Sequence, residues 1–487
     1  MQPVTTPDRF EAAARNSSAR IREVAVVGGG LAGLAAACAL VEAGYRVHLL
    51  ERRPYVGGRA SSYEHPGTGE VVDNCQHVLL GCCTNLIDFY RQLGVADRIR
   101  WFDQIVFLEP GGRRSTLRPG ILPAPLHNAI SFLGASALSL QDKLAISRGM
   151  MALLPGVPRD NGENFAAWLG RHGQTRRAID RFWNPVLVSA LNEDLDRMSV
   201  HYAGMVFRTS FLQSAQAGRM GVPTIPLSEL YGHAMGFIQA RGGEVSLRTR
   251  VDGFAYDDAR QRWQIRYEGG EMEADAGVLA VPFESMQKLL PQFPARPEGA
   301  SDALARQLEH FQHSPITGIH LWFDRKVTDL EHAVLLDTTI QWMYNKSLLQ
   351  PERRAESAGS YLELVVSASK SLVSKSRQEI IDLALRELAE FFPAVRDAKL
   401  VKAAVIKEVR ATFSVTPGLD ASRPGSTTAW PRLFLAGDWT ATGWPSTMEG
   451  AVRSGYLAAE ALTKTAGNPQ KFLLPDLPPQ GWMRLFG

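Results

Sequence analysis

Six residues near the start of the chain have the types and spacing that bind a dinucleotide. Residues 28–33 read Gly-Gly-Gly-Leu-Ala-Gly, which is the pattern G-x-G-x-x-G. In this pattern Gly28 permits a tight turn, Gly30 lets a pyrophosphate approach the backbone, and Gly33 allows a following helix to pack closely on a strand. We therefore expect this loop to bind the diphosphate of a dinucleotide cofactor.

The residues around the loop supply the other contacts that such a cofactor needs. A short apolar run precedes the glycines and an Ala- and Leu-rich stretch follows them, so a strand, a turn and a helix are predicted in that order. The N–H groups of Leu31 and Ala32 would lie at the helix N-terminus, where they favour an anion. Glu51 ends the next apolar run, where its carboxylate can accept both ribose hydroxyl hydrogens and disfavours a 2′-phosphate.

Composition and charge indicate a large folded protein and exclude several classes. The 487 residues are enough for two or three domains, and the 45% hydrophobic content is typical of a globular chain. Lys and Arg total 53 against 50 Asp and Glu, without a long basic block, so we expect no nucleic-acid partner. The 4 cysteines form no C-x-x-C pair and are too few for a disulfide framework, so we expect a cytoplasmic location and no metal site. Residues 1–20 lack the apolar run of a secretory signal.

Beyond the glycine loop, apolar patterns predict the elements that position these residues. Residues 100–219 are largely helical in pattern. Segments with the pattern of strands are residues 244–252, 253–256, 261–267, 277–281, 316–323, 361–367 and 433–436. Helices are predicted over residues 227–241 and 376–391 and from Thr447 onward. This order predicts an α/β fold, α+β overall, with a Rossmann-like part and a second, mixed sheet.

Further motifs resemble the flavin amine oxidase and phytoene desaturase superfamily. Residues 57–59, Gly-Gly-Arg, resemble the G-G-R motif that follows the ribose acid and lines the cofactor there. Residues 434–440, Phe-Leu-Ala-Gly-Asp-Trp-Thr, are similar to its strand-Gly-Asp motif, whose aspartate, here Asp438, holds the ribityl chain. Residues 446–455 resemble the helix that closes over the flavin, and Val251 lies where members contact the adenine through the backbone. The resemblance implies an amine-oxidase-type fold with non-covalent FAD.

Together, the residues and the resemblance predict one cofactor site. Its expected members are Gly28, Gly30, Leu31, Ala32, Gly33, Glu51, Arg52, Gly58, Arg59, Val251, Gly437, Asp438, Thr447 and Met448. The N–H groups at Thr447 and Met448 would face the N1/C2=O edge of the flavin and stabilise its negative charge on reduction. Ser446 and Glu449 also have the spacing of a capping box at this helix start.

The resemblance implies domains that interleave along the sequence. The expected FAD-binding domain comprises residues 21–100, 218–300 and 425–466. The expected substrate-binding domain comprises residues 101–217 and 301–424. Residues 1–20 and 467–487 are expected to form flexible or peripheral tails.

One segment resembles a particular branch, the hydroxysqualene dehydroxylases of bacterial hopanoid pathways. Residues 72–82 read Val-Asp-Asn-Cys-Gln-His-Val-Leu-Leu-Gly-Cys, and branch members usually have Gly where this chain has Cys75. The resemblance implies that reduced flavin delivers hydride to hydroxysqualene, giving squalene and water, with an unidentified electron donor. His77 is the candidate proton donor, because a histidine titrates near neutral pH. Asp73 is expected to bond to the backbone of its own loop.

A long apolar isoprenoid substrate suggests two further features. An apolar wall could come from Trp101, Phe102, Phe182, Trp183, Trp322 and Trp342. Residues 119–141 carry no charge, which suggests peripheral docking on the inner face of the cytoplasmic membrane, aided by Met150, Met151, Leu153 and Leu154.

Two alternative functions stay open. An FAD-dependent carotenoid or phytoene-type desaturase would use the same fold and a similar substrate, with hydride flowing in the opposite direction. A prenyl-lipid-binding escort protein would hold an isoprenoid without catalysis, although the glycine loop and Glu51 favour a bound flavin.

Overall fold

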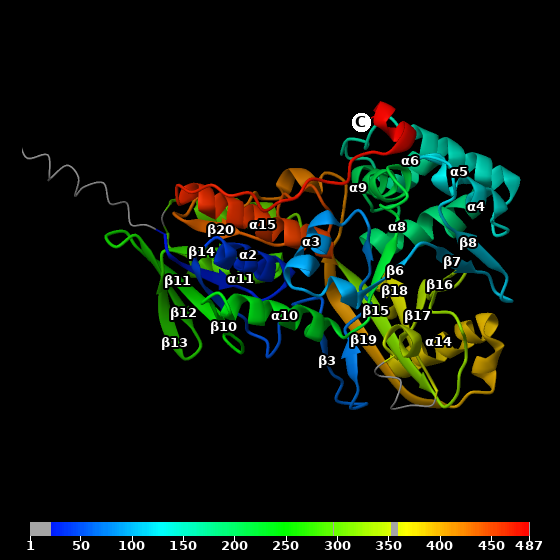
Figure 1. Cartoon of the computed structure of the whole chain (residues 1–487), viewed down its shortest axis with the longest axis horizontal. Helices are drawn as coiled ribbons and strands as arrows, with labels where there is room; N and C mark the ends of the chain where they lie inside the picture. The colour runs from blue at the N-terminus through cyan, green and yellow to red at the C-terminus, as the bar shows by residue number, and fades with distance from the viewer. Residues whose placement is uncertain (1–20, 296, 352–358, 487) are drawn as a thin grey trace, which may run out of the picture.

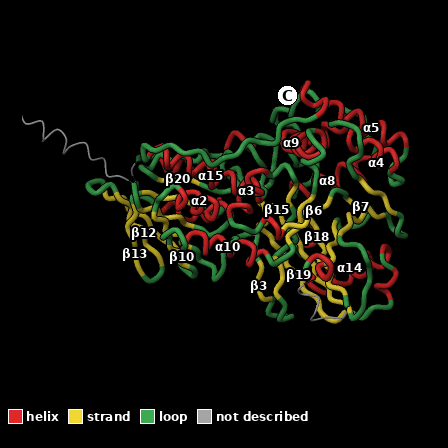
Figure 2. Tube along the Cα trace, in the orientation of Figure 1, coloured by secondary structure: helices red, strands yellow, loops and turns green. Residues whose placement is uncertain are grey.

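The molecule has two halves, each built around a sheet. The computed structural model describes residues 21–295, 297–351 and 359–486, so the expectations for residues 1–20 lie outside the described residues. Figure 1 shows the first half on the left, around β14 and α2, and the second half on the right, around β15 and α14. Figure 2 shows the strands gathered in these two groups, with helices beside each. The expected α/β fold with a Rossmann-like part and a mixed sheet is confirmed.

A parallel sheet of order β10-β2-β1-β14-β20 forms the base of the first half. Its strands in that order are Glu244–Ser246, Arg46–Leu50, Glu23–Val27, Ala276–Leu279 and Leu433–Leu435. Side chains alternate between the two faces of a strand, so Val24 and Val26 contribute to one apolar cluster and Ala25 and Val27 to another. The sheet thus buries both faces, as parallel sheets do.

Different layers cover the two faces of this sheet. One face carries helices α2 (Leu31–Glu42), α3 (Thr84–Gln92), α10 (Leu227–Gln239) and α15 (Met448–Thr465). The other face carries an antiparallel sheet of β11 (Val251–Asp257), β12 (Arg262–Tyr267) and β13 (Gly270–Ala274). Helices α2 and α15 lie so close that a Cβ atom added to Gly455 would be 2.3 Å from the carbonyl oxygen of Ala32.

The second half is built on a seven-stranded sheet of order β19-β15-β18-β17-β16-β7-β8. These strands in that order are Leu400–Phe413, His313–Phe323, Ser360–Ser367, Trp342–Asn345, His332–Leu335, Ile105–Leu108 and Arg114–Leu117. All neighbours are antiparallel except β16 and β7. Helix α14 (Arg377–Phe391) starts at a capping box between Ser376 and Glu379 and packs its apolar side on this sheet.

Short elements complete the molecule. A helical layer near β7 and β8 holds α4 (Ala129–Gly134), α5 (Leu140–Ala152), α6 (Phe165–Arg171), α7 (Arg176–Ala178), α8 (Asn184–Leu191) and α9 (Val200–Phe207). The other α-helices of the described residues are α11 (Phe283–Leu289), α12 (Ala300–Leu308) and α13 (Lys346–Leu349). Two small antiparallel sheets join β3 (Ser62–Glu64) with β4 (Val71–Asp73), and β5 (Leu79–Leu80) with β9 (Met220–Pro223) and β6 (Ile99–Phe102). Every helix of the described residues is too short or too polar to cross a lipid bilayer.

Two of the predicted segments differ from the structure. Residues 244–252, predicted as one strand, are divided between β10 and β11, which belong to different sheets. Residues 100–219, predicted as largely helical, also contain most of β6 and all of β7 and β8. These strands pair with partners far away in the sequence, which local pattern does not reveal.

The C-terminal segment is fastened to the molecule rather than a flexible tail. The N–H of Leu474 donates to Asn85 Oδ1 at 2.8 Å, and Arg453 pairs with Asp476 at 2.7 Å. The chain ends in a 3-10 helix, Gly481–Phe486, whose Met483 side chain is fully buried. Residues 467–486 therefore form a strap across the first half and the helical layer, which fits a peripheral segment and not a flexible one.

Candidate active site

A cavity of about 460 Å³ is lined by residues from both halves of the molecule. Its wall in the first half includes His77 and every predicted cofactor-binding residue except Gly33, namely Gly28, Gly30, Leu31, Ala32, Glu51, Arg52, Gly58, Arg59, Val251, Gly437, Asp438, Thr447 and Met448. Its wall in the second half includes Ser189, Asn192, Ile316, Glu408 and Thr412. Residues that lie far apart in the sequence thus meet at one site.

The glycine loop leaves room and donors for a diphosphate. A Cβ atom on Gly28, whose φ is +110°, would lie 2.5 Å from the carbonyl oxygen of Ala280, and one on Gly33 would lie 1.9 Å from that of Gly28. A Cβ atom on Gly30 would meet no atom nearer than the Cα atom of Gly58 at 3.9 Å, because Gly30 faces the cavity. No side chain caps α2, so its first N–H groups are available to an anion. Gly33 supports the loop from behind, as the motif predicts.

Glu51 has a second role besides facing the cavity. Its Oε2 accepts a hydrogen bond from the N–H of Gly29 at 2.6 Å, and its Oε1 accepts one from the N–H of Arg53 at 2.7 Å. The carboxylate therefore also holds the glycine turn closed. Each carboxylate oxygen has a second lone pair, which leaves acceptor capacity for ribose hydroxyl groups.

Asp438 joins the two ends of the chain beside the cavity. Its carboxylate accepts hydrogen bonds from the guanidinium of Arg59 and from the hydroxyl of Ser446. Arg59 also donates to the carbonyl oxygen of Ala411 at 3.1 Å, on β19 of the second half. The G-G-R loop, the strand-Gly-Asp motif and the start of α15 are thus linked in one polar network.

The start of α15 is not the capping box that the sequence suggests. Thr447 is the N-cap residue, and its hydroxyl accepts a hydrogen bond from the N–H of Gly450 at 3.0 Å. Glu449 is fully buried and accepts hydrogen bonds from the N–H groups of Asn85 and Leu86 at 3.2 and 2.7 Å. It therefore caps α3, a different helix, which has no side-chain cap from its own N-cap residue.

His77 lies on the cavity wall with one ring nitrogen engaged. Its Nδ1 is 2.7 Å from the carbonyl oxygen of Cys75, and its Nε2 has no hydrogen-bond partner among the described residues. Burial lowers the pKa of the imidazole below its usual value. The ring is therefore neutral at pH 7.

Behind His77 lies a buried charged cluster that sequence reasoning missed. The ammonium of Lys346, 1% exposed, lies 2.7 Å from Asp73 and 3.3 Å from Glu363, and it donates to Gln76 Oε1 at 2.9 Å. Burial opposes ionisation of Asp73, but Lys346 and other donors hold its pKa below the usual value. Burial raises the pKa of Glu363 to about 7. Asp73 also accepts from the N–H of Leu227 at 3.2 Å, so it does not bond to its own loop as expected.

One sequence signal could have pointed to this cluster. Glu363 interrupts the otherwise uncharged strand β18, and a carboxylate inside such a strand needs a buried partner. Lys346 carries no comparable signal, because its partner Asp73 is 273 residues away.

The predicted aromatic wall is wrong for this cavity. None of Trp101, Phe102, Phe182, Trp183, Trp322 and Trp342 lines it. Trp183 is fully buried and packs edge-on against Phe207, and Trp322 stacks on Tyr361 with ring centroids 4.4 Å apart. These aromatic side chains form core contacts instead.

Fold and site together define a dinucleotide-binding protein of the oxidoreductase class. A model of the family described as flavin containing amine oxidoreductase matches residues 31–463. The chain belongs to this family, and its cofactor is FAD. The open glycine loop, the uncapped α2 and the acidic Glu51 fit that cofactor.

Individual relatives and structures are similar to this chain over most of its length. A 15-cis-phytoene desaturase of Synechococcus elongatus is 28% identical over 460 residues, covering 90% of this chain and 95% of that protein. A probable zeta-carotene desaturase of the same organism is 27% identical over 478 residues, covering 90% of this chain and 98% of that protein. Wild-type putrescine oxidase bound to putrescine superposes with a TM-score of 0.69 at 18% identity, covering 91% of this chain and 99% of the other. An oxidoreductase from Methanosarcina mazei superposes with a TM-score of 0.68 at 17% sequence identity, covering 91% of this chain and 100% of the other. The two structures show that the fold is of the amine-oxidase type.

Proposed function

We propose that this FAD-dependent oxidoreductase desaturates a long isoprenoid hydrocarbon of the phytoene type. The two relatives from Synechococcus elongatus are named as desaturases, and each aligns over nearly its whole length. Their names support the desaturase alternative more strongly than the hydroxysqualene dehydroxylation that residues 72–82 suggest.

The observation that carries the proposal is the hydrogen bond of His77 to the Cys75 carbonyl oxygen. A carbonyl oxygen can only accept, so Nδ1 bears the hydrogen atom and Nε2 of the neutral ring keeps a lone pair. Because burial lowers its pKa, the ring stays in this neutral form at pH 7. His77 is therefore equipped to accept a proton at the cavity wall.

Desaturation is a reaction that needs such an acceptor. Two hydrogen atoms leave neighbouring carbon atoms of the substrate, and a C=C bond forms between those carbons. When bound, FAD would supply the acceptor for one of them as hydride, and an external two-electron acceptor, for which we propose a quinone, would be needed to reoxidise it. The other hydrogen leaves as a proton, which His77 Nε2 takes as a general base.

Reductive dehydroxylation of hydroxysqualene is the second candidate, because residues 72–82 resemble that branch. That reaction needs a proton donor at the departing hydroxyl group. A neutral His77 with its lone pair on Nε2 is poorly suited to donate a proton to that hydroxyl group. We therefore assign His77 as a proton acceptor, in place of the donor expected from the sequence. The escort alternative has no observation in its favour, since the cavity residues fit FAD.

Product analysis tests the proposal. The FAD-loaded protein is incubated with phytoene dispersed in detergent micelles and with a soluble quinone. We expect longer conjugated polyenes to form only when the quinone is present. Unchanged phytoene, together with squalene formed from hydroxysqualene by photoreduced protein, would replace this proposal with the second candidate.

A further inference from the structure

Large apolar side chains that face solvent are concentrated in two short parts of the chain. Fifteen such side chains are exposed across the described residues, and ten of them lie within residues 121–151 or 482–486. The most exposed are Ile121 at 94%, Leu485 at 81% and Leu140 at 70%. Scattered apolar side chains are ordinary on a protein surface, but a concentration of this kind marks an interaction site.

The two parts adjoin and form one surface, which we call the apolar face. The N–H of Trp482 donates to the carbonyl oxygen of Ala124 at 2.8 Å. Arg208 donates to the carbonyl oxygens of Leu153 and Phe486 at 3.2 and 2.7 Å. Figure 1 shows the C-terminal turn beside the helical layer that contains α5.

Helix α5 presents the opposite pattern to that of an ordinary surface helix. Leu140, Leu144 and Met151 share one side of the helix and are 60–70% exposed. The buried positions of α5 include the small residues Ala145 and Gly149. Ile146 is also buried, but three large apolar side chains of α5 face outward, which suits an apolar partner at that side.

Charge along the two segments that form the apolar face is almost entirely positive. Between residues 110 and 159 the only acidic residue is Asp142, which is 3% exposed and caps α5. Arg118 and Arg148 are exposed in this region, and Arg484 is exposed in the C-terminal turn. None of these three arginines forms an ion pair within the described ranges. An apolar surface bordered by free guanidinium groups is complementary to an anionic lipid surface.

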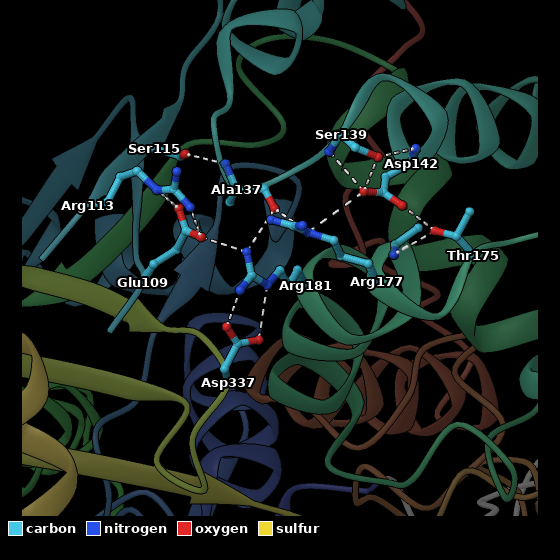
Figure 3. Close-up of polar contacts among 11 residues, drawn as sticks. Glu109, Arg113, Ser115, Ala137, Ser139, Asp142, Thr175, Arg177, Arg181 and Asp337 are labelled. Atoms are coloured by element: carbon cyan, nitrogen blue, oxygen red, sulfur yellow. Dashed lines mark hydrogen bonds and ion pairs between the residues drawn. The ribbon is translucent and has the colours of Figure 1, made fainter. Parts of the chain in front are cut away.

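The helical layer that carries the apolar face is held firmly to the second half. Figure 3 shows Arg181 between the carboxylates of Glu109 and Asp337, which it pairs with at 2.6 and 2.5 Å. Arg177 and Arg181 both donate to the carbonyl oxygen of Ala137, just before α5, at 3.1 and 3.0 Å. The apolar face therefore has a fixed orientation relative to the sheet that lines the cavity.

We propose that the apolar face docks onto an anionic lipid bilayer. The inference rests on the proposed function in one respect, because a substrate of phytoene type dissolves in lipid and not in water. Exposed leucines would enter the acyl region, Trp482 would lie at the headgroup level, and the arginines would face lipid phosphates. The sequence expectation of docking through residues 119–141 with the end of α5 is thereby extended to Leu144 and to the C-terminal turn, whereas Leu153 is fully buried.

Vesicle sedimentation tests the docking surface. The full-length holoprotein is mixed with vesicles of phosphatidylglycerol and phosphatidylcholine, and with vesicles of phosphatidylcholine alone. We expect binding to the anionic vesicles, and a loss of at least tenfold in the double variant Leu140→Gln and Leu144→Gln. The matched control, Val401→Gln and Val409→Gln, changes two valines that are 55% and 50% exposed on β19 and should bind as the wild type does.

A charge variant and two further readouts complete the test. Arg148→Gln with Arg484→Gln should lose the preference for anionic vesicles, whereas Arg386→Gln with Arg396→Gln should keep it. FAD content and turnover of detergent-dispersed phytoene should be equal in all variants, which separates this proposal from the proposed function. Equal vesicle binding by wild type and the leucine variant would overturn the proposal. A wild-type dimer that the leucine variant converts to a monomer would overturn it too, because the occupant would then be a second copy of the chain.

Discussion

At the scale of single residues, the site depends on which groups hold protons. Lys346 lies between two buried carboxylates, so one cation faces two potential anions. Asp73 has the shorter contact and further donors from Ser62 and Leu227, which favours its ionised form. Glu363 then retains a proton to near pH 7. The cluster is thus neutral overall at mildly acidic pH and gains a negative charge as the pH rises.

Glu363→Gln should remove the part of the pH dependence of the unfolding free energy that comes from this carboxyl group. The pKa of Glu363 is about 7 in the folded protein against 4.5 for the unperturbed group, so the folded state binds more protons between these values. The stabilising contribution of Glu363 to the unfolding free energy is fully present below pH 4.5 and is lost as the pH rises through 7. The difference in unfolding free energy between wild type and variant should therefore change by about 2–3 kcal/mol between pH 5 and pH 8.

Denaturant unfolding at the two pH values measures this difference. Glu271→Gln, at an exposed position, serves as the control and should show no such change. A wild-type-minus-variant difference that is the same at both pH values would contradict the assigned protonation of Glu363.

His77→Gln tests the role of the histidine as a base. We expect turnover to fall by about 10²–10⁴-fold with FAD content unchanged. Because a base must be unprotonated and burial lowers the pKa of His77, wild-type turnover should be lost only on the acidic side of the ordinary histidine range. His233→Gln, on the exposed side of α10, is the control and should be fully active. A wild-type rate that falls as the pH rises through this range would indicate a proton donor instead.

At the scale of elements, local sequence signals identified segments that line one cavity in the folded structure. The glycine loop, Glu51 and the start of α15 lie within short segments whose turns and helix starts depend on their own residues. Contacts between distant segments could not be predicted in this way. Glu449 has the spacing of a local cap but bonds to α3, and Asp73 bonds to Lys346, because the folded chain brings these partners together. The prediction of an aromatic wall was wrong, because aromatic residues of this kind are also typical of a hydrophobic core.

Gly30→Val tests whether the glycine loop binds the diphosphate of FAD. The branched side chain would project into the cavity between the glycine loop and Gly58, where we propose that the diphosphate lies. We expect a folded protein that purifies without the yellow colour of FAD. Gly232→Val is the control, since a Cβ atom there meets no atom within 4 Å, and it should be yellow. Full FAD content in Gly30→Val, measured by absorbance, would disprove the assignment of this loop.

At the scale of the whole molecule, the C-terminal strap ties together parts that no single sheet connects. It bonds to α3 and α15 in the first half and ends at the helical layer, where Met483 is fully buried. Met483→Ala should therefore lower the unfolding free energy by about 2–4 kcal/mol. Met151→Ala, at a side chain that is 60% exposed, should change it by less than about 0.5 kcal/mol. Thermal unfolding midpoints compare the two, and equal midpoints would contradict the structural role of the strap.

The direction of hydride flow is the central claim for the molecule as a whole. Anaerobic single-turnover spectroscopy tests it most directly, with oxidised protein mixed with phytoene and photoreduced protein mixed with hydroxysqualene. We expect phytoene to bleach the visible absorption of FAD as an equal amount of desaturated product forms, and hydroxysqualene to leave the reduced spectrum unchanged. Unchanged oxidised FAD with phytoene, together with recovery of the oxidised spectrum as squalene forms from hydroxysqualene, would contradict the account.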